Sequence, residues 1–327
     1  MGYTPPFTLN AKSINLIAEI NEEVGRLSVG GLTKDPKLRR VNRLKSIQSS
    51  LAIENNSLTL DQVTDVIDGK QVFGNPREIQ EVKNAFAAYD AMEGMDPNSV
   101  EHLLRAHGIM MGSILDDAGR FRRGGVGVFS NEGIVHMGPP ADRVPILISE
   151  LTEWLRDSDY HPLVKGCVFH YEFEFIHPFS DGNGRMGRMW HTLILSKWRE
   201  GMAWVPVESI VREHQQEYYN AIALSTKLGD SGPFIELMLS LISDALKACT
   251  SSDNNSARYG LNATEGRLLS MIGDGIYQSS EEAAAVLSVS ARTVERAIRS
   301  LREKGLIERE GSNKSGKWRI TDDKMSG

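Results

Sequence analysis

One stretch of the chain, HPFSDGNGRMGR at residues 177–188, has the residue types that bind a polyphosphate. Gly182 and Gly184 stand two apart in a turn, so the backbone there can adopt positive φ and direct successive N–H groups at one point. Arg185 and Arg188 follow at the expected start of a helix, where two guanidinium groups and the helix N-terminus face the same anion. The segment therefore predicts an anion cradle.

Two further side chains in this stretch could act on a bound nucleotide. Asp181 offers a hard carboxylate oxygen, which suits Mg²⁺ when the ion also bridges phosphate oxygens. His177 lies four residues earlier, and an imidazole with an ordinary pKa of about 6.5 can accept a proton from an attacking hydroxyl group. Each residue alone also has a structural interpretation, as a turn glycine, a surface histidine or a solvated arginine. At about 5% per residue type, eight specified positions match by chance roughly once in 10⁹ to 10¹⁰ windows, so we favour the functional interpretation.

The stretch resembles the signature of the Fic family, H-x-F-x-D/E-G-N-G-R-x-x-R, and every specified position matches. The resemblance implies a mainly α fold, in which an all-helical core with a β-hairpin flap binds Mg-ATP. It also implies transfer of AMP to a Ser, Thr or Tyr hydroxyl of a target protein, with release of pyrophosphate. The roles implied by position are His177 as general base, Asp181 as Mg²⁺ ligand, Gly182, Asn183, Gly184 and Arg185 on the α- and β-phosphates, Arg188 on the γ-phosphate, and Phe179 as the core anchor of the loop.

Phosphoryl transfer by a kinase is disfavoured. The chain has no G-x-x-x-x-G-K-S/T loop, which excludes a Walker-type phosphate site. The related Doc-type kinases carry a lysine where this chain has Gly184.

Residues 122–140 predict a β-hairpin, because Val126 and Val128 alternate before a turn and a returning strand. The hairpin resembles the family's flap, whose edge strand pairs with an extended segment of the target protein. The alternative is an ordinary surface hairpin. Helical periodicity resumes after it and runs through 164–176, and it stops at His177 because a proline follows.

Amphipathic helices dominate residues 1–100, and one of them carries a second motif. The stripe over 38–51 predicts a helix that ends at Glu54, Asn55 and Asn56, since asparagine suits a helix C-terminus. Residues 50–55, SLAIEN, resemble the family's inhibitory motif S/T-x-x-x-E-G/N, which assigns inhibitory roles to Ser50 and Glu54.

The position of Glu54 predicts its partner. A carboxylate at a helix C-terminus meets the negative end of the helix dipole, at a cost of about 0.3 to 1 kcal/mol, so a compensating cation is expected. Arg188 is the candidate, and an Arg188 paired with Glu54 cannot bind the γ-phosphate. The alternative is a solvated glutamate in a short motif that many helices match by chance.

A third segment, EYYN at 217–220, resembles the family's adenine-side helix, and Tyr219 is the ring expected to cover the base. The asparagine often seen seven residues later is Thr226 here, which leaves strict preference for ATP open. The alternative is that Tyr218 and Tyr219 are simply core and surface aromatics.

The C-terminal part predicts a separate domain. The polar segment 251–256, SSDNNS, indicates a linker. Three short helices over 263–304 and a strand-turn-strand to 320 then resemble a winged helix-turn-helix, with Arg292, Arg296 and Arg299 along one face of its third helix. DNA and a partner protein are both open as its ligand. We expect three domains: 1–100, an N-terminal helical region with the inhibitory helix; 101–250, the Fic core; and 257–327, the winged helix.

The composition is that of a globular protein, with 40% hydrophobic and 24% charged residues. The net charge of −6 gives no global attraction to nucleic acid, which leaves only a local basic surface. Two cysteines are too few for a disulfide framework. No apolar run is long enough to span a bilayer and no signal-like segment begins the chain, so we expect a cytoplasmic protein without membrane contact. Monomer and homodimer both remain open.

Three functions compete on this evidence. The first is an auto-inhibited protein adenylyltransferase, and the second is a de-AMPylase in which Glu54 positions water in the same site. The third is a nucleotide-sensing transcriptional regulator that binds DNA. A sensor has no need of His177, so the intact signature favours an enzyme.

Overall fold

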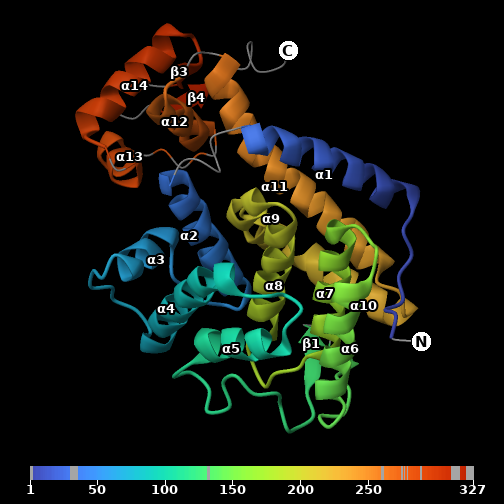
Figure 1. Cartoon of the computed structure of the whole chain (residues 1–327). Coiled ribbons are helices and arrows are strands. Elements are labelled where there is room, and N and C mark those ends of the chain that lie inside the picture. Colours follow the sequence, from blue (N-terminus) through green and yellow to red (C-terminus); the bar gives the residue numbers. More distant parts are fainter. Residues whose placement is uncertain are drawn as a thin grey trace. The chain divides into compact units, whose positions relative to one another are not determined.

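The chain forms two compact units, Met1–Lys247 and Ala248–Gly327, in the computed structural model (Figure 1). The structure describes residues 3–29, 36–130, 133–258, 261–273, 275, 277, 279–287, 289–310 and 317–321. The expected mainly α class is confirmed, since helices make up most of the described chain and the strands form two hairpins. None of the described helices is both long and apolar enough to cross a membrane.

The first unit is a helical assembly with one small hairpin (Figure 1). It contains both the predicted N-terminal region and residues 101–247 of the predicted core. Its elements are α1 (Ala11–Val29), α2 (Pro36–Ile53), α3 (Leu60–Ile67), α4 (Pro76–Ala91), η1 (Met92–Gly94), α5 (Val100–Met111), β1 (Gly127–Ser130), β2 (Gly133–Met137), α6 (Val144–Asp157), α7 (Pro162–Ile176), α8 (Asn183–Trp198), η2 (Glu200–Trp204), α9 (Val207–Glu213), α10 (Gln215–Leu228) and α11 (Gly232–Arg258), the last of which continues past residue 247.

The helix pair α7 and α8 forms the centre of this unit, and the two helices pack along each other (Figure 1). The sequence of α7, PLVKGCVFHYEFEFI, is apolar on nearly all sides, as expected of a helix surrounded by others. The connection between α7 and α8 is residues 177–182, so the predicted signature loop starts from two buried helices. A loop held at both ends in this way has little freedom to move.

Helix α2 is fixed in the first unit by polar as well as apolar contacts. It packs against α4, α8 and α9. The buried Ser46 hydroxyl donates to Glu208 at 2.7 Å, and the Asn42 amide donates to the carbonyl of Trp204 at 3.0 Å. The helix ends at Ile53, and Asn55 adopts a left-handed conformation with φ of 66°, which confirms the predicted end. Glu54 is thereby held at a fixed place.

The predicted flap is a two-stranded antiparallel hairpin. Its register pairs Gly127 with Met137 and Ser130 with Gly133, and an irregularity follows Val128. The expected turn at 131–133 lies largely outside the described residues. The hairpin is confirmed as a structural element.

The second unit has the order helix, helix, helix, strand, strand, as predicted. It contains α12 (Ala263–Gly273), α13 (Ser280–Leu287), α14 (Ala291–Glu303), β3 (Ile307–Glu310) and β4 (Lys317–Ile320). The strands β3 and β4 pair antiparallel, and the three helices bury a shared apolar core that includes Leu268, Val294 and Leu301.

The predicted linker is wrong as a loop, because residues 251–256 continue α11 as helix. Serine, asparagine and aspartate are poor helix formers by only a few tenths of a kcal/mol each. Extending a helix that already exists avoids the cost of nucleating a new one, so it can offset that penalty. Composition alone could not reveal this context.

Candidate active site

The loop from His177 to Gly182 has a strained backbone that its own side chains hold in place. His177 ends α7 in the left-handed region, with φ of 50°, and Gly182 has φ of 85°. The Asn183 amide closes the loop: its Nδ2 donates to the Phe179 carbonyl and its Oδ1 accepts from the Phe179 N–H, both at 2.9 Å. Phe179 is fully buried and stacks on His107 with ring centroids 3.6 Å apart. The predicted anchoring role of Phe179 is thus confirmed.

The first turn of α8 forms the cradle. Its first intrahelical hydrogen bond runs from the Met186 N–H to the Gly182 carbonyl at 3.0 Å. The N–H groups that precede it, at Asn183, Gly184 and Arg185, therefore have no partner within the helix and carry its positive dipole end. Since the Asn183 side chain closes the loop, only its backbone N–H remains for an anion.

The predicted ion pair between Glu54 and Arg188 is present. Arg188 Nη2 donates to Glu54 Oε1 at 2.7 Å, Nε donates to Ser50 Oγ at 3.1 Å, and Nη2 also donates to the Ser50 carbonyl at 3.0 Å. The Glu54 carboxylate reaches over the start of α8, because a methyl group on Gly184 would collide with its Oε1. The side chain of Arg188 is 2% exposed and that of Glu54 is 30% exposed. While this pair is intact, Arg188 is engaged by Glu54 and Ser50 and is not available to another anion.

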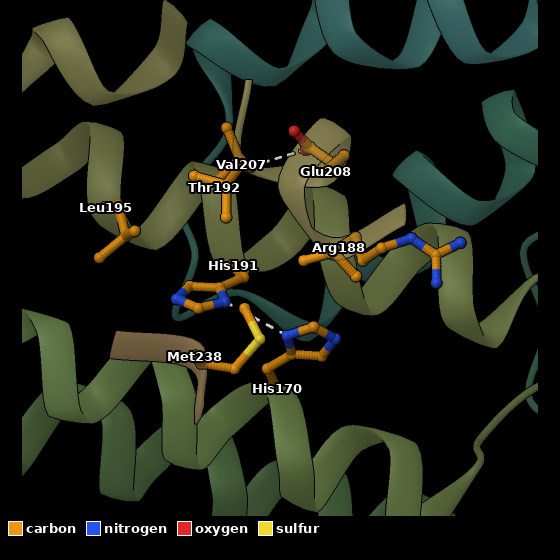
Figure 2. Close-up of a pocket in the computed structure, with 9 residues that line it drawn as sticks. His170, Arg188, His191, Thr192, Leu195, Val207, Glu208 and Met238 are labelled. Atoms are coloured by element: carbon orange, nitrogen blue, oxygen red, sulfur yellow. Dashed lines mark hydrogen bonds between the residues drawn. The ribbon is translucent and has the colours of Figure 1, made fainter. Parts of the chain in front are cut away.

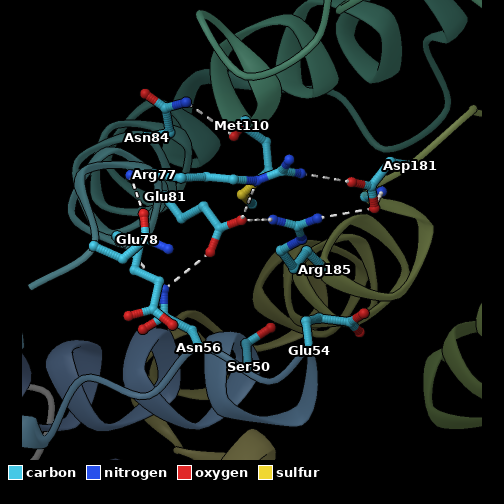
Figure 3. Close-up of polar contacts among 12 residues, drawn as sticks. Ser50, Glu54, Asn56, Arg77, Glu78, Glu81, Asn84, Met110, Asp181 and Arg185 are labelled. Atoms are coloured by element: carbon cyan, nitrogen blue, oxygen red, sulfur yellow. Dashed lines mark hydrogen bonds and ion pairs between the residues drawn. The ribbon is translucent and has the colours of Figure 1, made fainter.

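The second signature arginine is also occupied by carboxylates (Figure 3). Arg185 donates to Glu81 Oε1 at 3.3 Å and to Asp181 Oδ1 at 3.1 Å. Arg77 lies 3.3 Å from the other Asp181 oxygen, and Glu81 Oε2 accepts from the Asn56 amide at 2.9 Å. Glu81 therefore connects the chain just beyond the inhibitory motif to the cradle. Nothing in the sequence marked this residue.

The environment of His177 suits a neutral general base. Burial lowers the pKa of His177 below its ordinary value, and the Arg122 cation lowers it further, while the contact with the Glu174 carbonyl opposes this shift. The ring Nδ1 lies 3.3 Å from that carbonyl. A carbonyl can only accept, so this contact assigns the proton to Nδ1 and leaves the lone pair on Nε2. An imidazole in this tautomer can accept a proton at Nε2.

Buried titratable groups lie beneath Arg188 (Figure 2). His170 Nδ1 lies 3.2 Å from His191 Nδ1, and Tyr218 OH lies 3.0 Å from His170 Nε2. Burial lowers the pKa of His191 to about 4 and raises that of Glu174 to about 8. The cavity lined by these histidines has a volume of about 10 Å³, which is the space of about one water molecule rather than of a nucleotide. The cavity at His170 and His191 is therefore too small for a nucleotide, and we interpret these histidines as part of the packing beneath Arg188.

The position of Asp181 suits its expected role as a Mg²⁺ ligand. Its carboxylate is 41% exposed beside the cradle. The described residues form no cluster of three His, Cys, Asp or Glu side chains that could hold a metal ion. A single carboxylate completed by phosphate oxygens and water matches how Mg²⁺ binds with nucleotides.

The adenine-side prediction concerns two neighbouring tyrosines of α10. Tyr218 is buried, whereas Tyr219 is 40% exposed. Burial and the Glu54 carboxylate both raise the pKa of Tyr219, which places this ring near the Glu54–Arg188 pair. Thr226, the residue that departs from the family pattern, is in hydrogen-bonding contact with Tyr171 at 3.2 Å. Contact of Tyr219 with a base stays a prediction.

Sequence reasoning missed three residues beside the loop, of which His107 and Arg122 are buried and Glu81 is half-buried. His107 Nε2 contacts the Asp181 carbonyl at 3.0 Å, Arg122 contacts the carbonyl of His177, and Glu81 holds Arg185. A histidine within an apolar helix and an arginine beside a predicted hairpin were the available signals, and neither indicates a partner.

A helical core with this loop and a hairpin beside it is the arrangement of the Fic fold. Residues 97–195 match the model of the Fic/DOC family, and residues 259–317 match that of the MarR family. A Fic family protein from Desulfovibrio desulfuricans G20 of known crystal structure is 45% identical, with a TM-score of 0.74 over 98% of this chain and 99% of that one. The chain belongs to the Fic family.

More distant relatives share the fold or part of the chain. Fic-1 (aa134 - 508) from C. elegans has a TM-score of 0.63 at 23% identity, over 75% of this chain and 73% of that one. The protein adenylyltransferases Fic of Aedes aegypti and Culex quinquefasciatus are each 27% identical, over 60% and 62% of this chain. The matched part spans about two fifths of the length of these curated relatives, 39% and 41%.

Proposed function

We propose that this protein is an auto-inhibited adenylyltransferase that moves AMP from Mg-ATP to a hydroxyl group of a target protein. The observation that carries the proposal is the Glu54–Arg188 pair across the cradle, beside a complete signature loop. A carboxylate that occupies Arg188 can inhibit only if Arg188 otherwise binds a ligand, so the pair implies that Arg188 takes part in ligand binding. Relatives named protein adenylyltransferase support the reaction class.

In the proposed reaction His177 Nε2 accepts the proton of the target hydroxyl as its oxygen attacks the α-phosphorus. The bond between the α-phosphorus and the bridging oxygen to the β-phosphate breaks, and pyrophosphate leaves. The N–H groups of Gly184 and Arg185 and the Arg185 guanidinium stabilise the charge on the phosphates. Asp181 would hold Mg²⁺, which neutralises phosphate charge and orients the leaving group.

Auto-inhibition follows from competition for Arg188. ATP can enter while Glu54 holds Arg188, but its γ-phosphate lacks a clamp, so the α-phosphate is not aligned for in-line attack. Once Glu54 leaves, Arg188 binds the γ-phosphate and sets that alignment. The target segment would pair with the main chain of the hairpin β1–β2, which tolerates varied target sequences.

ATP labelled at the α-phosphate, incubated with the protein and a lysate, tests the proposal directly. We expect the Glu54→Gly variant to label itself and target proteins well above wild type. Adding His177→Ala or Arg188→Ala should abolish the gain, and mass spectrometry should find AMP on Ser, Thr or Tyr. A folded, ATP-binding Glu54→Gly variant that labels no more than wild type contradicts the proposal.

Removal of AMP in the same site is a second candidate, because the Glu54 carboxylate beside the cradle could activate water. Incubation of AMP-modified target with wild type and with Glu54→Gly distinguishes the two directions. Release of AMP that requires Glu54 would establish hydrolysis as an activity of this site.

The second unit is proposed to bind duplex DNA, in keeping with its MarR-family match. Arg292, Arg296 and Arg299 are exposed along one face of α14 and suit phosphate contacts. We expect the full chain to bind duplex with an affinity that falls as salt rises, because each phosphate contact releases counterions. Absence of binding at low salt would leave a partner protein as its ligand, and binding changed by ATP would favour the nucleotide-sensing regulator.

A further inference from the structure

A buried arginine joins the base of the hairpin to the loop that carries His177. Arg122 is 3% exposed. Its Nη1 donates to the Gly124 carbonyl at 2.8 Å, and its Nη2 donates to the Pro139 carbonyl at 2.6 Å. These two carbonyls lie on opposite sides of the base of the hairpin. One guanidinium group therefore holds both ends of the hairpin.

The same guanidinium also contacts both peptide groups around His177. Its Nε donates to the His177 carbonyl at 2.7 Å, and its Nη2 donates to the Ile176 carbonyl at 3.2 Å. The backbone N–H of Arg122 donates to the next carbonyl, that of Pro178, at 3.0 Å. Arg122 thus contacts three successive carbonyls at the end of α7, where His177 has its left-handed conformation.

The chemistry of this contact favours arginine over other residues. The four side-chain bonds described for Arg122 all end on backbone carbonyls, so the cation is balanced by dipoles rather than by a carboxylate. Burial lowers the pKa of Arg122, which reflects the cost of desolvating it. Only a planar fork with five donors reaches four carbonyls in fixed directions, and a lysine ammonium has three donors on a flexible stem.

We propose that Arg122 is a positioning residue for AMP transfer, which sets the distance between the hairpin and His177. A target segment paired with the hairpin then presents its hydroxyl group at His177 Nε2. The proposal rests on the proposed function, since it assigns Arg122 a part in the same reaction. Arg122 does not touch the cradle by any described contact, so nucleotide binding is expected to be independent of it.

The test uses the full chain in the Glu54→Gly background. Arg122→Lys removes the fork but keeps the cation, whereas Arg122→Met removes both. The neighbouring Arg123 is exposed and supplies matched controls, Arg123→Lys and Arg123→Met. The measurements are ADP affinity by calorimetry, single-turnover auto-modification with labelled ATP, and hydrogen exchange of the hairpin amides.

We expect both Arg122 variants to bind ADP within about twofold of the parent, while transfer falls by roughly 10²-fold, the usual consequence of misplacing reacting groups by about 1 Å. Hairpin amides, among them the Gly138 N–H bonded to Val126 at 3.0 Å, should exchange faster. The Arg123 controls should match the parent. Transfer at the parental rate in either Arg122 variant overturns the proposal, and so does loss of ADP binding in proportion to loss of transfer.

The pH profile measures separately the effect of the Arg122 charge on His177. The charged groups that affect the His177 ring are Arg122, Asp181 and, in wild type, Glu54. Loss of the cation in Arg122→Met raises the pKa of His177, so the acidic limb of the rate profile should shift to higher pH, whereas Arg122→Lys should leave it in place. If the Glu54→Gly parent itself fails to transfer AMP, it is the proposed function that has failed.

Discussion

The Glu54→Gln substitution tests the ion pair by stability, without any assumption about the reaction. It keeps the size of the side chain and one acceptor oxygen but removes the charge opposite Arg188. Arg188 is 2% exposed and would keep its two contacts with Ser50 and a neutral acceptor in place of the carboxylate. A hydrogen bond to a charged group contributes about 1.5 to 3 kcal/mol, and a neutral acceptor about 0.5 to 1.5. Because Glu54 is 30% exposed and partly screened, we expect a loss of about 1 to 2 kcal/mol.

For a domain of this size such a loss lowers Tm by about 2 to 8 °C. The matched control is Glu22→Gln, which removes the charge from an Arg–Glu pair of similar distance, 2.6 Å, on the surface of α1. Its side chains are 51% and 67% exposed, so we expect a change below about 1 kcal/mol.

Nucleotide supplies the second half of this test. A ligand stabilises the folded state in proportion to the logarithm of its concentration over Kd. If Glu54 competes with the γ-phosphate, saturating Mg-ATP should raise Tm more in Glu54→Gln than in wild type. Scanning calorimetry with and without ligand measures both effects. A Glu54→Gln protein with wild-type Tm and a wild-type ligand shift would refute the reasoning.

Three other predictions follow from the same contacts. Ser50→Ala removes the acceptor of Arg188 Nε and should cost about 1 kcal/mol, with labelling between wild type and Glu54→Gly; full inhibition would contradict it. Glu81→Gln should remove the charge of one of the two carboxylates that hold Arg185 and raise ADP affinity severalfold by calorimetry, with unchanged affinity as the contrary result. Burial raises the pKa of Glu174 to about 8. Between the unfolded pKa near 4.5 and pH 8, this carboxyl group is therefore protonated in the folded state and ionised in the unfolded state. The free energy of unfolding falls as pH rises across that window. Glu174→Gln should therefore raise Tm relative to wild type at pH 8 to 9 and change it little near pH 5. Between these values the difference in the free energy of unfolding should grow by at most about 1.4 kcal/mol per pH unit.

Local patterns in the sequence predicted the features whose causes are local. The end of α7 at His177 follows from the proline after it, and the positive φ of Gly182 follows from the turn sequence. The Glu54–Arg188 pair spans 134 residues and was predicted because two family motifs named its two partners.

Contacts without a motif could not be predicted in this way. Arg122 and Glu81 are charged residues in unremarkable stretches, and their partners are backbone carbonyls and a side chain far along the chain. Only the tertiary fold brings Glu81 of α4 to Arg185 and Arg122 to the carbonyl of His177. The helical course of 251–256 was missed for a related reason, because it depends on the helix that precedes it.

The attachment of Glu54 to α2, a helix fixed by Ser46 and Asn42, means that in the proposed mechanism the inhibitor and the inhibited site are on one folded scaffold. The effective concentration of the Glu54 carboxylate at Arg188 is then set by the fold and not by the amount of protein present. Diluting the protein should leave the activity per molecule unchanged, in contrast to an inhibitor that arrives on a second chain. Under this proposal, activation requires an event that moves the last turn of α2 relative to Arg188.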